Sequence, residues 1–466
     1  MPLFLYGYFM ADIDQILEKI RTCQSQLHVF EIKNKKYIYN NDKNLILRVN
    51  NSFFKIFNSN LAHPKITPGA ERLLISIDSL GFFQEQKPQI SVSSFRKCHL
   101  YFDFSNRCNL KCKYCYVQKN EIYQLVPERA LSLIKSFVTK NCKSFDEFII
   151  DFCCFGEPLL HFDDLKFIKA KLAVFSDELN VKIELIFTTN TVLLSMEMSD
   201  YFISTKQQFG VSFDGPINQH NSNRSDSYDK VINALTMYRN RSGAKRFKYL
   251  WASTVVNRAP ENLVTILKHN VDFGFDSVIL KPSRQLERSK ELLQLKKSYW
   301  KMVQFLIGEY RKGNIQYLAA ILNSSDYFGK HIRSLIRNER LLWRCGAGRH
   351  LYLMNQKGEI SPCIQFHGES FLRLGDTNST LNTKVMESLG KTDCCKCWAR
   401  SLCGGTCYYL NHVYPNDCGF NCELKQSLIE YAIYLIDQIS TINSELFRKL
   451  DKLILIKEKF FRSMGD

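Results

Sequence analysis

Three cysteines have a spacing suited to iron–sulfur chemistry. Cys108, Cys112 and Cys115 form a CxxxCxxC run in a chain of 466 residues that contains 17 cysteines. Three thiolates on one short loop can bind three irons of a [4Fe–4S] cluster and leave the fourth iron open to another ligand. Zinc would need a fourth Cys or His nearby, and none lies at a suitable distance in the sequence. The run therefore predicts a [4Fe–4S] cluster with one open iron.

The residues around this run resemble a known family signature. Residues 105–116 have Asn-Leu after the first cysteine and an aromatic residue, Tyr114, before the third. This pattern resembles the signature of the radical S-adenosylmethionine (SAM) enzymes. The resemblance implies that the methionyl amine and carboxylate of SAM chelate the open iron, and it assigns Tyr114 to the cofactor site. One electron from the cluster would then break the S–C5′ bond, giving methionine and a 5′-deoxyadenosyl radical.

Two further segments resemble motifs that form the SAM pocket in this family. Phe155-Gly156-Glu157-Pro158 looks like the family's GGEP segment, which meets the methionyl amine, with Phe155 in place of the first Gly. Thr188-Thr189-Asn190-Thr191 resembles the TNG turn, with Thr191 in place of Gly. By this resemblance, the cofactor-binding residues in the two segments are Gly156, Glu157, Pro158, Thr189 and Asn190.

A third segment resembles a motif of the peptide-modifying branch of the family. Ser212-Phe213-Asp214-Gly215-Pro216, followed by His220 and Arg224, closely resembles the SxDGP…H…R run of that branch. An Asp-Gly-Pro tripeptide alone is more often an ordinary turn. Because the segments come in order, each after its own predicted strand, together they support a SAM pocket. The resemblance places Ser212 on the ribose or carboxylate of SAM, Arg224 in the cofactor site and Asp214 near the substrate, as the candidate catalytic residue.

A second set of cysteines lies in the C-terminal part of the chain. Cys345 is followed by Gly358 and Cys363, then by a CX2CX5CX3C run from Cys394 to Cys407, and finally by Cys422. This pattern closely matches the SPASM extension of radical SAM enzymes. The resemblance implies two auxiliary [4Fe–4S] clusters, which makes three clusters in all. The family's interleaving gives three ligands to the first auxiliary cluster and four to the second: Cys345, Cys363 and Cys407, then Cys394, Cys397, Cys403 and Cys422.

Three points about these auxiliary sites stay open in the sequence. No other cysteine lies between Cys345 and Cys363, where fully ligated relatives have one, so we expect an open iron in the first auxiliary cluster. A substrate thiolate, which is a soft ligand, could bind there. Cys418 is an alternative to Cys422, which we prefer because a helix follows it, as in the family. A pair of structural zinc sites is the competing interpretation, although zinc ribbons rarely interleave their ligands in this way.

Repeated strand–helix units must position these motifs. From Cys98 onward, short apolar strands alternate with helical patterns, and the strands are expected at residues 100–104, 148–152, 183–188, 211–213, 249–256 and 278–280. Such repeats imply a parallel sheet. We therefore predict an α/β fold with a partial (β/α)6 TIM-like barrel at residues 98–300. Active groups in such barrels follow the strands, and each pocket motif above does so.

Smaller segments flank the predicted barrel. Strands at residues 28–32, 36–39 and 45–49 precede a helix that begins after Thr67, with Pro68 at its first position, and stops at Gly81. Residues 1–90 resemble the winged-helix-like RiPP recognition element (RRE) of enzymes that modify ribosomal peptides. Such a domain would bind a leader peptide as an added strand. After the barrel we expect a helical bridge at 301–344, a cysteine-rich SPASM domain at 345–440 and a C-terminal helix at 441–466.

Charge and hydropathy limit the partners. The formal net charge is +17, which suits nucleic acid, an anionic membrane or an acidic peptide. The basic residues are scattered without a long Lys/Arg run, and no stretch of about 18 or more apolar residues occurs. We therefore expect a cytoplasmic protein with no nucleic-acid partner and no membrane span. A basic surface would suit an acidic leader peptide.

These resemblances favour a radical SAM peptide maturase. The segment from Cys397-Trp398-Ala399-Arg400 to Cys407 resembles the CWAR…CGGxC stretch of maturases that form thioether crosslinks in ribosomal peptides. We expect thioether formation in a precursor peptide, with flavodoxin or ferredoxin as the external one-electron reductant. The alternatives are an anaerobic sulfatase maturase, which makes formylglycine, and another SPASM enzyme that forms C–C crosslinks. A non-catalytic iron–sulfur scaffold is disfavoured because it would not need a SAM pocket.

Overall fold

The computed structural model describes most of the chain. The described residues are 13–23, 27–58, 66–83, 96–117, 121–152, 155–257, 262–283, 291–341, 343–368, 372–384, 386, 394, 397–413 and 419–461. Cys418, the alternative ligand, lies outside them. The chain divides into unit 1, with residues 1–91, 338–343 and 391–405, and unit 2, with residues 92–337, 344–390 and 406–466. Within the described ranges, no helix is both long and apolar enough to cross a membrane.

The described N-terminal part of unit 1 contains a small sheet and three helices around one core. Strands β1 (Leu27–Ile32), β2 (Lys35–Asn40) and β3 (Leu45–Val49) are antiparallel and lie in that order. Helices α1 (Ile13–Cys23), α2 (Asn51–Asn58) and α3 (Pro68–Ser79) share the buried core with β2. Thr67 caps α3 because its hydroxyl accepts a hydrogen bond from the Ala70 N–H. The three predicted strands and the helix after Thr67 are confirmed.

A segment from the C-terminal part of the chain completes unit 1. Trp398 stacks on His28 of β1, with ring centroids 3.5 Å apart and an interplanar angle of 3°. The N–H of Ser401, in α15 (Arg400–Cys403), donates to the side-chain oxygen of Asn41 at 2.8 Å. Three predicted cluster ligands belong to this segment: Cys394, Cys397 and Cys403.

Unit 2 is built on a mixed sheet of nine strands in the order β12-β11-β10-β4-β5-β6-β7-β8-β9. Strands β4 to β9 are mutually parallel and follow chain order, as an α/β fold requires. Their bounds confirm the six predicted strands: β4 (Lys97–Phe102), β5 (Glu147–Phe152), β6 (Lys182–Thr189), β7 (Phe209–Ser212), β8 (Leu250–Val256) and β9 (Val278–Pro282).

Three short strands extend this sheet beyond β4. β10 (Leu351–Met354) pairs in parallel with β4, and β11 (Glu359–Ser361) and β12 (Gly375–Asp376) follow in antiparallel pairing. Sequence analysis predicted no strands in this cysteine-rich region. The three strands join the cysteine-rich region to the sheet that carries the motifs.

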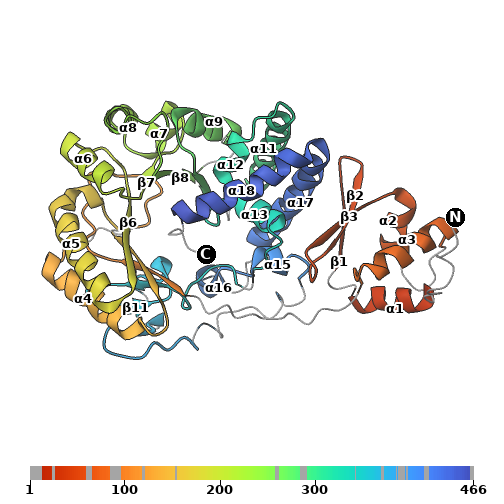
Figure 1. Ribbon diagram of the computed structural model, residues 1–466, viewed down its shortest axis with the longest axis horizontal. Helices are drawn as coiled ribbons and strands as arrows, with labels where there is room; N and C mark the ends of the chain where they lie inside the picture. The colour runs from red at the N-terminus through yellow and green to blue at the C-terminus, as the bar shows by residue number, and fades with distance from the viewer. Residues whose placement is uncertain are drawn as a thin grey trace. The chain divides into compact units, whose positions relative to one another are not determined.

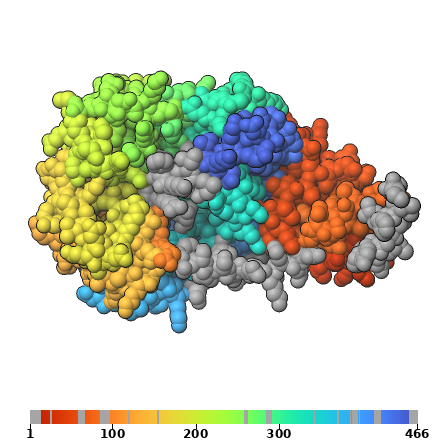
Figure 2. All heavy atoms as spheres, in the orientation of Figure 1, coloured from red at the N-terminus to blue at the C-terminus, as the bar shows by residue number. Residues whose placement is uncertain are grey.

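Helices between the parallel strands cover the outer face of the curved sheet (Figure 1). They form the yellow and green surface of unit 2 in Figure 2. The elements are α4 (Pro127–Asn141), α5 (Phe162–Leu179), α6 (Met196–Ser204), α7 (Ile217–Asn223), α8 (Tyr228–Ser242) and α9 (Leu263–Phe273). The later helices of unit 2 are α11 (Leu292–Arg311), α12 (Gln316–Ile321), α13 (Gly329–Ile336), α16 (Tyr408–Val413), α17 (Gly419–Ile442) and α18 (Ser444–Phe461).

Candidate functional site

The cysteine loop begins directly after β4 and is held at its base by two buried polar residues. Ser105 donates from its hydroxyl to the Tyr123 carbonyl at 2.9 Å. The Asn106 side chain donates to the Glu121 carbonyl at 2.6 Å and accepts from the Tyr123 N–H at 3.0 Å. Both side chains are almost inaccessible to solvent. The base of the loop is therefore fixed by its own side chains, as buried polar groups require.

The three thiols of this loop lie close enough to interact electrostatically. Burial raises the pKa of Cys112, the nearby Arg224 guanidinium lowers it, and the thiolates of Cys108 and Cys115 raise it. The Arg224 cation thus favours the thiolate form of Cys112, which is the form that binds iron. The loop therefore fits the chemistry of a cluster held by three cysteines.

The Gly156-Glu157 segment after β5 packs directly on the cysteine loop. A Cβ at position 156 would lie 2.5 Å from the Arg107 carbonyl oxygen and 2.7 Å from that of Ser105, so only glycine fits. The Glu157 N–H donates to the Arg107 carbonyl at 2.8 Å. Pro158 then begins a buried 3-10 turn. Close backbone approach, not side-chain contact, joins these two motifs.

The Glu157 carboxylate links this segment to the turn after β6. One oxygen accepts hydrogen bonds from the Leu159 N–H at 3.0 Å and the Thr189 hydroxyl at 2.5 Å. The other oxygen accepts from the Asn190 N–H at 2.8 Å. Burial raises the pKa of Glu157 to about 6, while these donors lower it. Its acceptor sites are used within the protein, so Glu157 braces the backbone at the strand ends.

The turn after β6 also reaches back to the cysteine loop. Asn190 donates from its side-chain amide to the side-chain oxygen of Asn109 at 2.8 Å. Thr191, which replaces the family's Gly, has φ 58°, a left-handed conformation that is unusual for a β-branched residue. Its N–H donates to the Thr189 hydroxyl oxygen at 2.9 Å and its own hydroxyl donates to the Asn190 carbonyl at 2.8 Å. These bonds keep the glycine-like turn despite the substitution.

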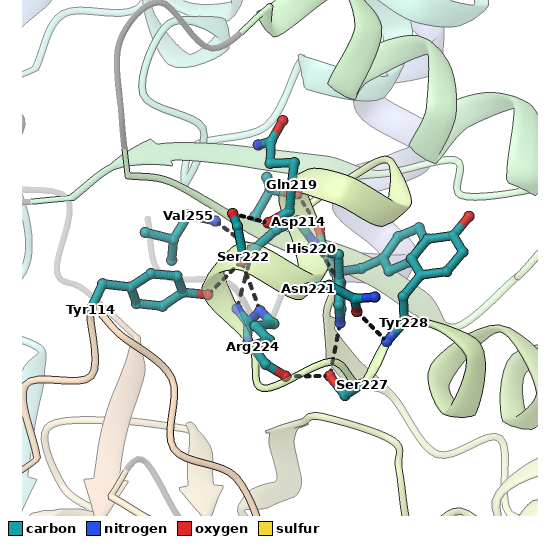
Figure 3. A network of polar contacts seen from close by, with 12 residues as sticks. Tyr114, Asp214, Gln219, His220, Asn221, Ser222, Arg224, Ser227, Tyr228 and Val255 are labelled. Carbon is teal, nitrogen blue, oxygen red and sulfur yellow. Dashed lines mark hydrogen bonds and ion pairs between the residues drawn. The ribbon is translucent and has the colours of Figure 1, made fainter.

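Asp214 lies after β7 at the centre of a buried network (Figure 3). One carboxylate oxygen accepts from the Tyr114 hydroxyl at 2.7 Å and from Arg224 Nε at 2.9 Å. The other accepts from the Val255 N–H at 3.0 Å and from Arg224 Nη2 at 3.3 Å. The Asp214 side chain has no solvent exposure. Because Tyr114 stands between Cys112 and Cys115, this carboxylate anchors the cysteine loop.

His220 fixes the backbone on both sides of this ion pair. Its Nδ1 accepts from the Asp214 N–H at 3.4 Å, and its Nε2 lies 3.0 Å from the Ser227 hydroxyl. That hydroxyl donates to the Arg224 carbonyl at 2.7 Å, so His220 Nε2 must carry the proton that faces it. Burial lowers the pKa of His220 to about 4. The imidazole is therefore neutral near pH 7 and acts as a structural link.

The end of α7 and the turn after it accept hydrogen bonds from the backbone of the cysteine loop as well. The Lys113 N–H donates to the Asn223 carbonyl at 3.0 Å, and the Lys111 N–H donates to the Ser225 hydroxyl at 3.2 Å. Ser212, the last residue of β7, is partly exposed on the opposite side of the strand from the buried Val211. Sequence analysis missed the roles of Asn109, Asn223 and Ser225. Only Asn109, next to Cys108, could have been suspected from its position.

Three of the C-terminal cysteines lie together in unit 2. Burial raises the pKa of Cys345, and the Cys407 thiolate raises it further. Burial raises the pKa of Cys363 to about 12, and the thiolates of both other cysteines add to that rise. Iron would compensate the cost of ionising these thiols. The residues thus fit the chemistry of the first auxiliary cluster, although no group of three Cys, His, Asp or Glu among the described residues is arranged for a single metal ion.

The predicted ligands of the second auxiliary cluster are described in two places. In unit 1, the Cys397 N–H donates to the Cys394 carbonyl at 3.3 Å, and Cys403 ends α15 before Gly404, which has φ 74°. Cys422 belongs to α17 in unit 2. The assignment of these four cysteines to one cluster stays a prediction.

Comparison with known proteins matches the region that contains these motifs to a known family. Residues 102–249 match the model of the Radical SAM superfamily. A stretch of 147 residues is 30% identical to the radical SAM cyclopropyl synthase TigE of Paramaledivibacter caminithermalis, covering 28% of this chain and 30% of TigE. The uncharacterized protein MJ0907 of Methanocaldococcus jannaschii is 24% identical over 311 residues, which are 65% of this chain and 96% of that protein.

A solved structure shows the same fold. The structure of native anSMEcpe with bound AdoMet and Kp18Cys peptide aligns with a TM-score of 0.59 and 20% identity, covering 74% of this chain and 99% of that chain. The family match spans the cysteine loop and all three pocket motifs in the order observed here. Residues 102–249 of this chain therefore form a radical SAM domain.

Proposed function

We propose that this enzyme modifies a ribosomally made precursor peptide and forms thioether crosslinks between a Cys sulfur and a carbon of the same peptide. The observation that carries the proposal is the buried Tyr114–Asp214–Arg224 network. In this network Asp214 and Arg224, which belong to the SxDGP…H…R run, anchor the cysteine loop through Tyr114. That run resembles a motif of the peptide-modifying branch. The anSMEcpe structure, which shares the fold, has AdoMet and a peptide bound.

The residues around the cysteine loop would hold the cofactors. Cys108, Cys112 and Cys115 would bind the cluster, whose chemistry with SAM is to supply a 5′-deoxyadenosyl radical. Gly156 and Pro158 shape the backbone beside the loop, and Glu157 fixes Thr189 and Asn190 at the end of β6. Ser212 presents its hydroxyl on the accessible side of β7. Glu157, Thr189 and Asn190 are held in place before any cofactor binds, because their hydrogen bonds are made within the protein.

The C-terminal cysteines would serve the thioether step. The net reaction removes two hydrogens from the peptide: one as an atom from carbon, to the deoxyadenosyl radical, and one as a proton from the thiol. The remaining electron needs an acceptor, and an auxiliary cluster held by Cys345, Cys363 and Cys407 would provide one. With only three thiolates in that set, a substrate thiolate could take the fourth position. Cys394, Cys397, Cys403 and Cys422 would hold the second auxiliary cluster, within a SPASM domain at residues 345–440.

The N-terminal part of unit 1 would bind the leader peptide. Its three-stranded sheet pairs β3 only with β2 among the described residues, so one side of β3 can accept a further strand. Arg48, on β3, is exposed beside this side of the sheet. An RRE-like domain at residues 1–90 with an arginine on this strand would suit an acidic leader. Flavodoxin or ferredoxin would supply the priming electron.

The test is co-expression of the enzyme with the short Cys-rich open reading frame nearest to its gene, followed by mass spectrometry. Thioether formation predicts the loss of two hydrogen atoms per crosslink together with the loss of one alkylatable thiol. Formylglycine would instead give a hydrazide-reactive aldehyde, and a C–C crosslink would leave every thiol alkylatable. Either of those products would overturn the thioether assignment. The Cys112→Ala variant, which should form no 5′-deoxyadenosine, is the control.

A further inference from the structure

The inner face of the parallel sheet is accessible near the ends of its strands. On each of β4 to β9, at least one residue close to the C-terminal end is partly buried or exposed, while its chain neighbours on the outer face are buried. These residues share a polar or amphipathic character and lie on neighbouring strands: Tyr101, Asp151, Thr188, Ser212, Ser253 and Lys281.

An apolar floor lies directly beneath this polar layer. Ile149, Ile186, Trp251 and Ile279 form one buried cluster across four strands. Because strand side chains alternate between faces, residues two positions further along these strands face the same side. Gly210 provides the space for the indole, since a Cβ there would lie 2.6 Å from Trp251 Nε1. Lys281, two residues after Ile279, therefore stands on the inner face above the floor.

Lys281 is a cation without a partner in this layer. Its side chain is exposed on the inner face, and no hydrogen bond or ion pair reaches it from the part of the chain that the structure describes. The surrounding protein nevertheless lowers its pKa by desolvation, and Asp326 and Asp151 act in the opposite direction. The charged form of an ammonium group in such surroundings is stabilised when an anionic ligand binds next to it.

The two carboxylates that raise the pKa of Lys281, those of Asp326 and Asp151, already have other partners. Asp151 faces His99 Nε2 at 3.2 Å. Asp326 is buried and accepts three backbone N–H groups, from Leu280 at 2.7 Å, Phe328 at 3.0 Å and Gly329 at 2.5 Å. Neither forms an ion pair with Lys281. The positive charge of Lys281 therefore stays available to a molecule that enters the inner face.

We propose that Lys281 binds a carboxylate of the substrate, the side chain of an Asp or Glu residue next to the position that reacts. This proposal rests on the proposed function, since it takes the substrate to be a peptide. A charge-assisted hydrogen bond from the ammonium would hold that carboxylate. Lys281 would thus fix which residue of the peptide reaches the radical.

The experiment uses two capped amino acids as probes, N-acetyl-L-glutamic acid amide and its neutral isostere N-acetyl-L-glutamine amide. Their binding to the full-length, cluster-reconstituted enzyme with SAM present is measured by ligand-observed NMR titration. We expect the wild-type enzyme to bind the acidic probe about tenfold more tightly than the neutral probe. Lys281→Met should remove the difference, and Lys281→Arg should retain part of it. Lys245→Met, which alters an exposed lysine just before β8, should change nothing.

Two outcomes would overturn the proposal. One is equal binding of both probes by the wild-type enzyme, a result that does not depend on any variant folding. The other is a loss of SAM binding by Lys281→Met in equilibrium dialysis, which would assign the ammonium to the methionyl carboxylate. Failure of the proposed function would look different, because an unmodified precursor peptide would leave the discrimination between the two probes intact.

Discussion

At the scale of single residues, Asp214 is the side chain on which the site depends most. Sequence analysis placed it near the substrate as the catalytic residue, but four donors occupy its two oxygens. Asp214→Asn would leave the buried Arg224 charge uncompensated, at a cost of about 3–5 kcal/mol in unfolding free energy. We expect this variant to lose iron on gel filtration and to melt at a lower temperature. Colorimetric iron assay and thermal unfolding measure the two effects.

The alternative, a directly catalytic Asp214, gives a different result. That role predicts full iron content and normal 5′-deoxyadenosine formation without peptide, but no modified peptide. Asp200→Asn is the matched control, because Asp200 pairs with Arg241 at an exposed site. Exposed ion pairs contribute little, so this control should keep the wild-type melting temperature and iron content.

At the scale of elements, the segments that follow β4 and β5 are held together because their backbones approach one another closely. Gly156→Ala would place a methyl group against two backbone carbonyls of the cysteine loop, and backbone atoms cannot move aside as a flexible side chain can. We expect the variant to retain little radical SAM cluster and to form little 5′-deoxyadenosine, measured by chromatography after reconstitution. Gly308→Ala is the control.

Gly308 lies inside α11, and nothing is within 4 Å of the Cβ that alanine would add there. Alanine in a helix interior is favoured over glycine by about 1 kcal/mol. The control should therefore be slightly more stable than the wild-type enzyme and fully active. Wild-type iron content in Gly156→Ala would show that the loop can shift, and would contradict the close-packing argument.

The same scale shows what the sequence could and could not predict. The six parallel strands are apolar runs, and motif residues follow the first four of them, so both the strands and the positions of the motifs were predictable. β10 was not, because its four residues gain a strand conformation by pairing with β4, which lies far away in the chain. The Tyr114–Asp214 hydrogen bond was not predictable either, since it joins residues 100 positions apart. Thr191 was read as a departure, and only its φ shows that the turn is kept.

At the scale of the whole molecule, unit 1 joins the expected peptide-binding domain to a cysteine-bearing segment. Besides the His28–Trp398 stack, the Asn44 side-chain amide donates a hydrogen bond to the Asn338 side-chain oxygen at 3.1 Å, and the Arg340 guanidinium lies 3.7 Å from the Asp42 carboxylate. Residues 338–343 and 391–405 are thus held by the N-terminal sheet. The N-terminal domain then has a second task, which is to order the segment that carries Cys394, Cys397 and Cys403.

This arrangement changes what a truncation should do. Deleting residues 1–90 removes the ring against which Trp398 stacks and the acceptor of the Ser401 N–H, so it should disturb the ligands proposed for the second auxiliary cluster. We expect the truncated enzyme to lose about four irons per chain, the same loss as in Cys394→Ala, while Cys112-dependent 5′-deoxyadenosine formation persists. Iron and sulfide assays of the three proteins make the comparison. Wild-type iron content in the truncated enzyme would mean that the cysteine segment is ordered without the sheet, and the two tasks of the N-terminal domain would then be independent.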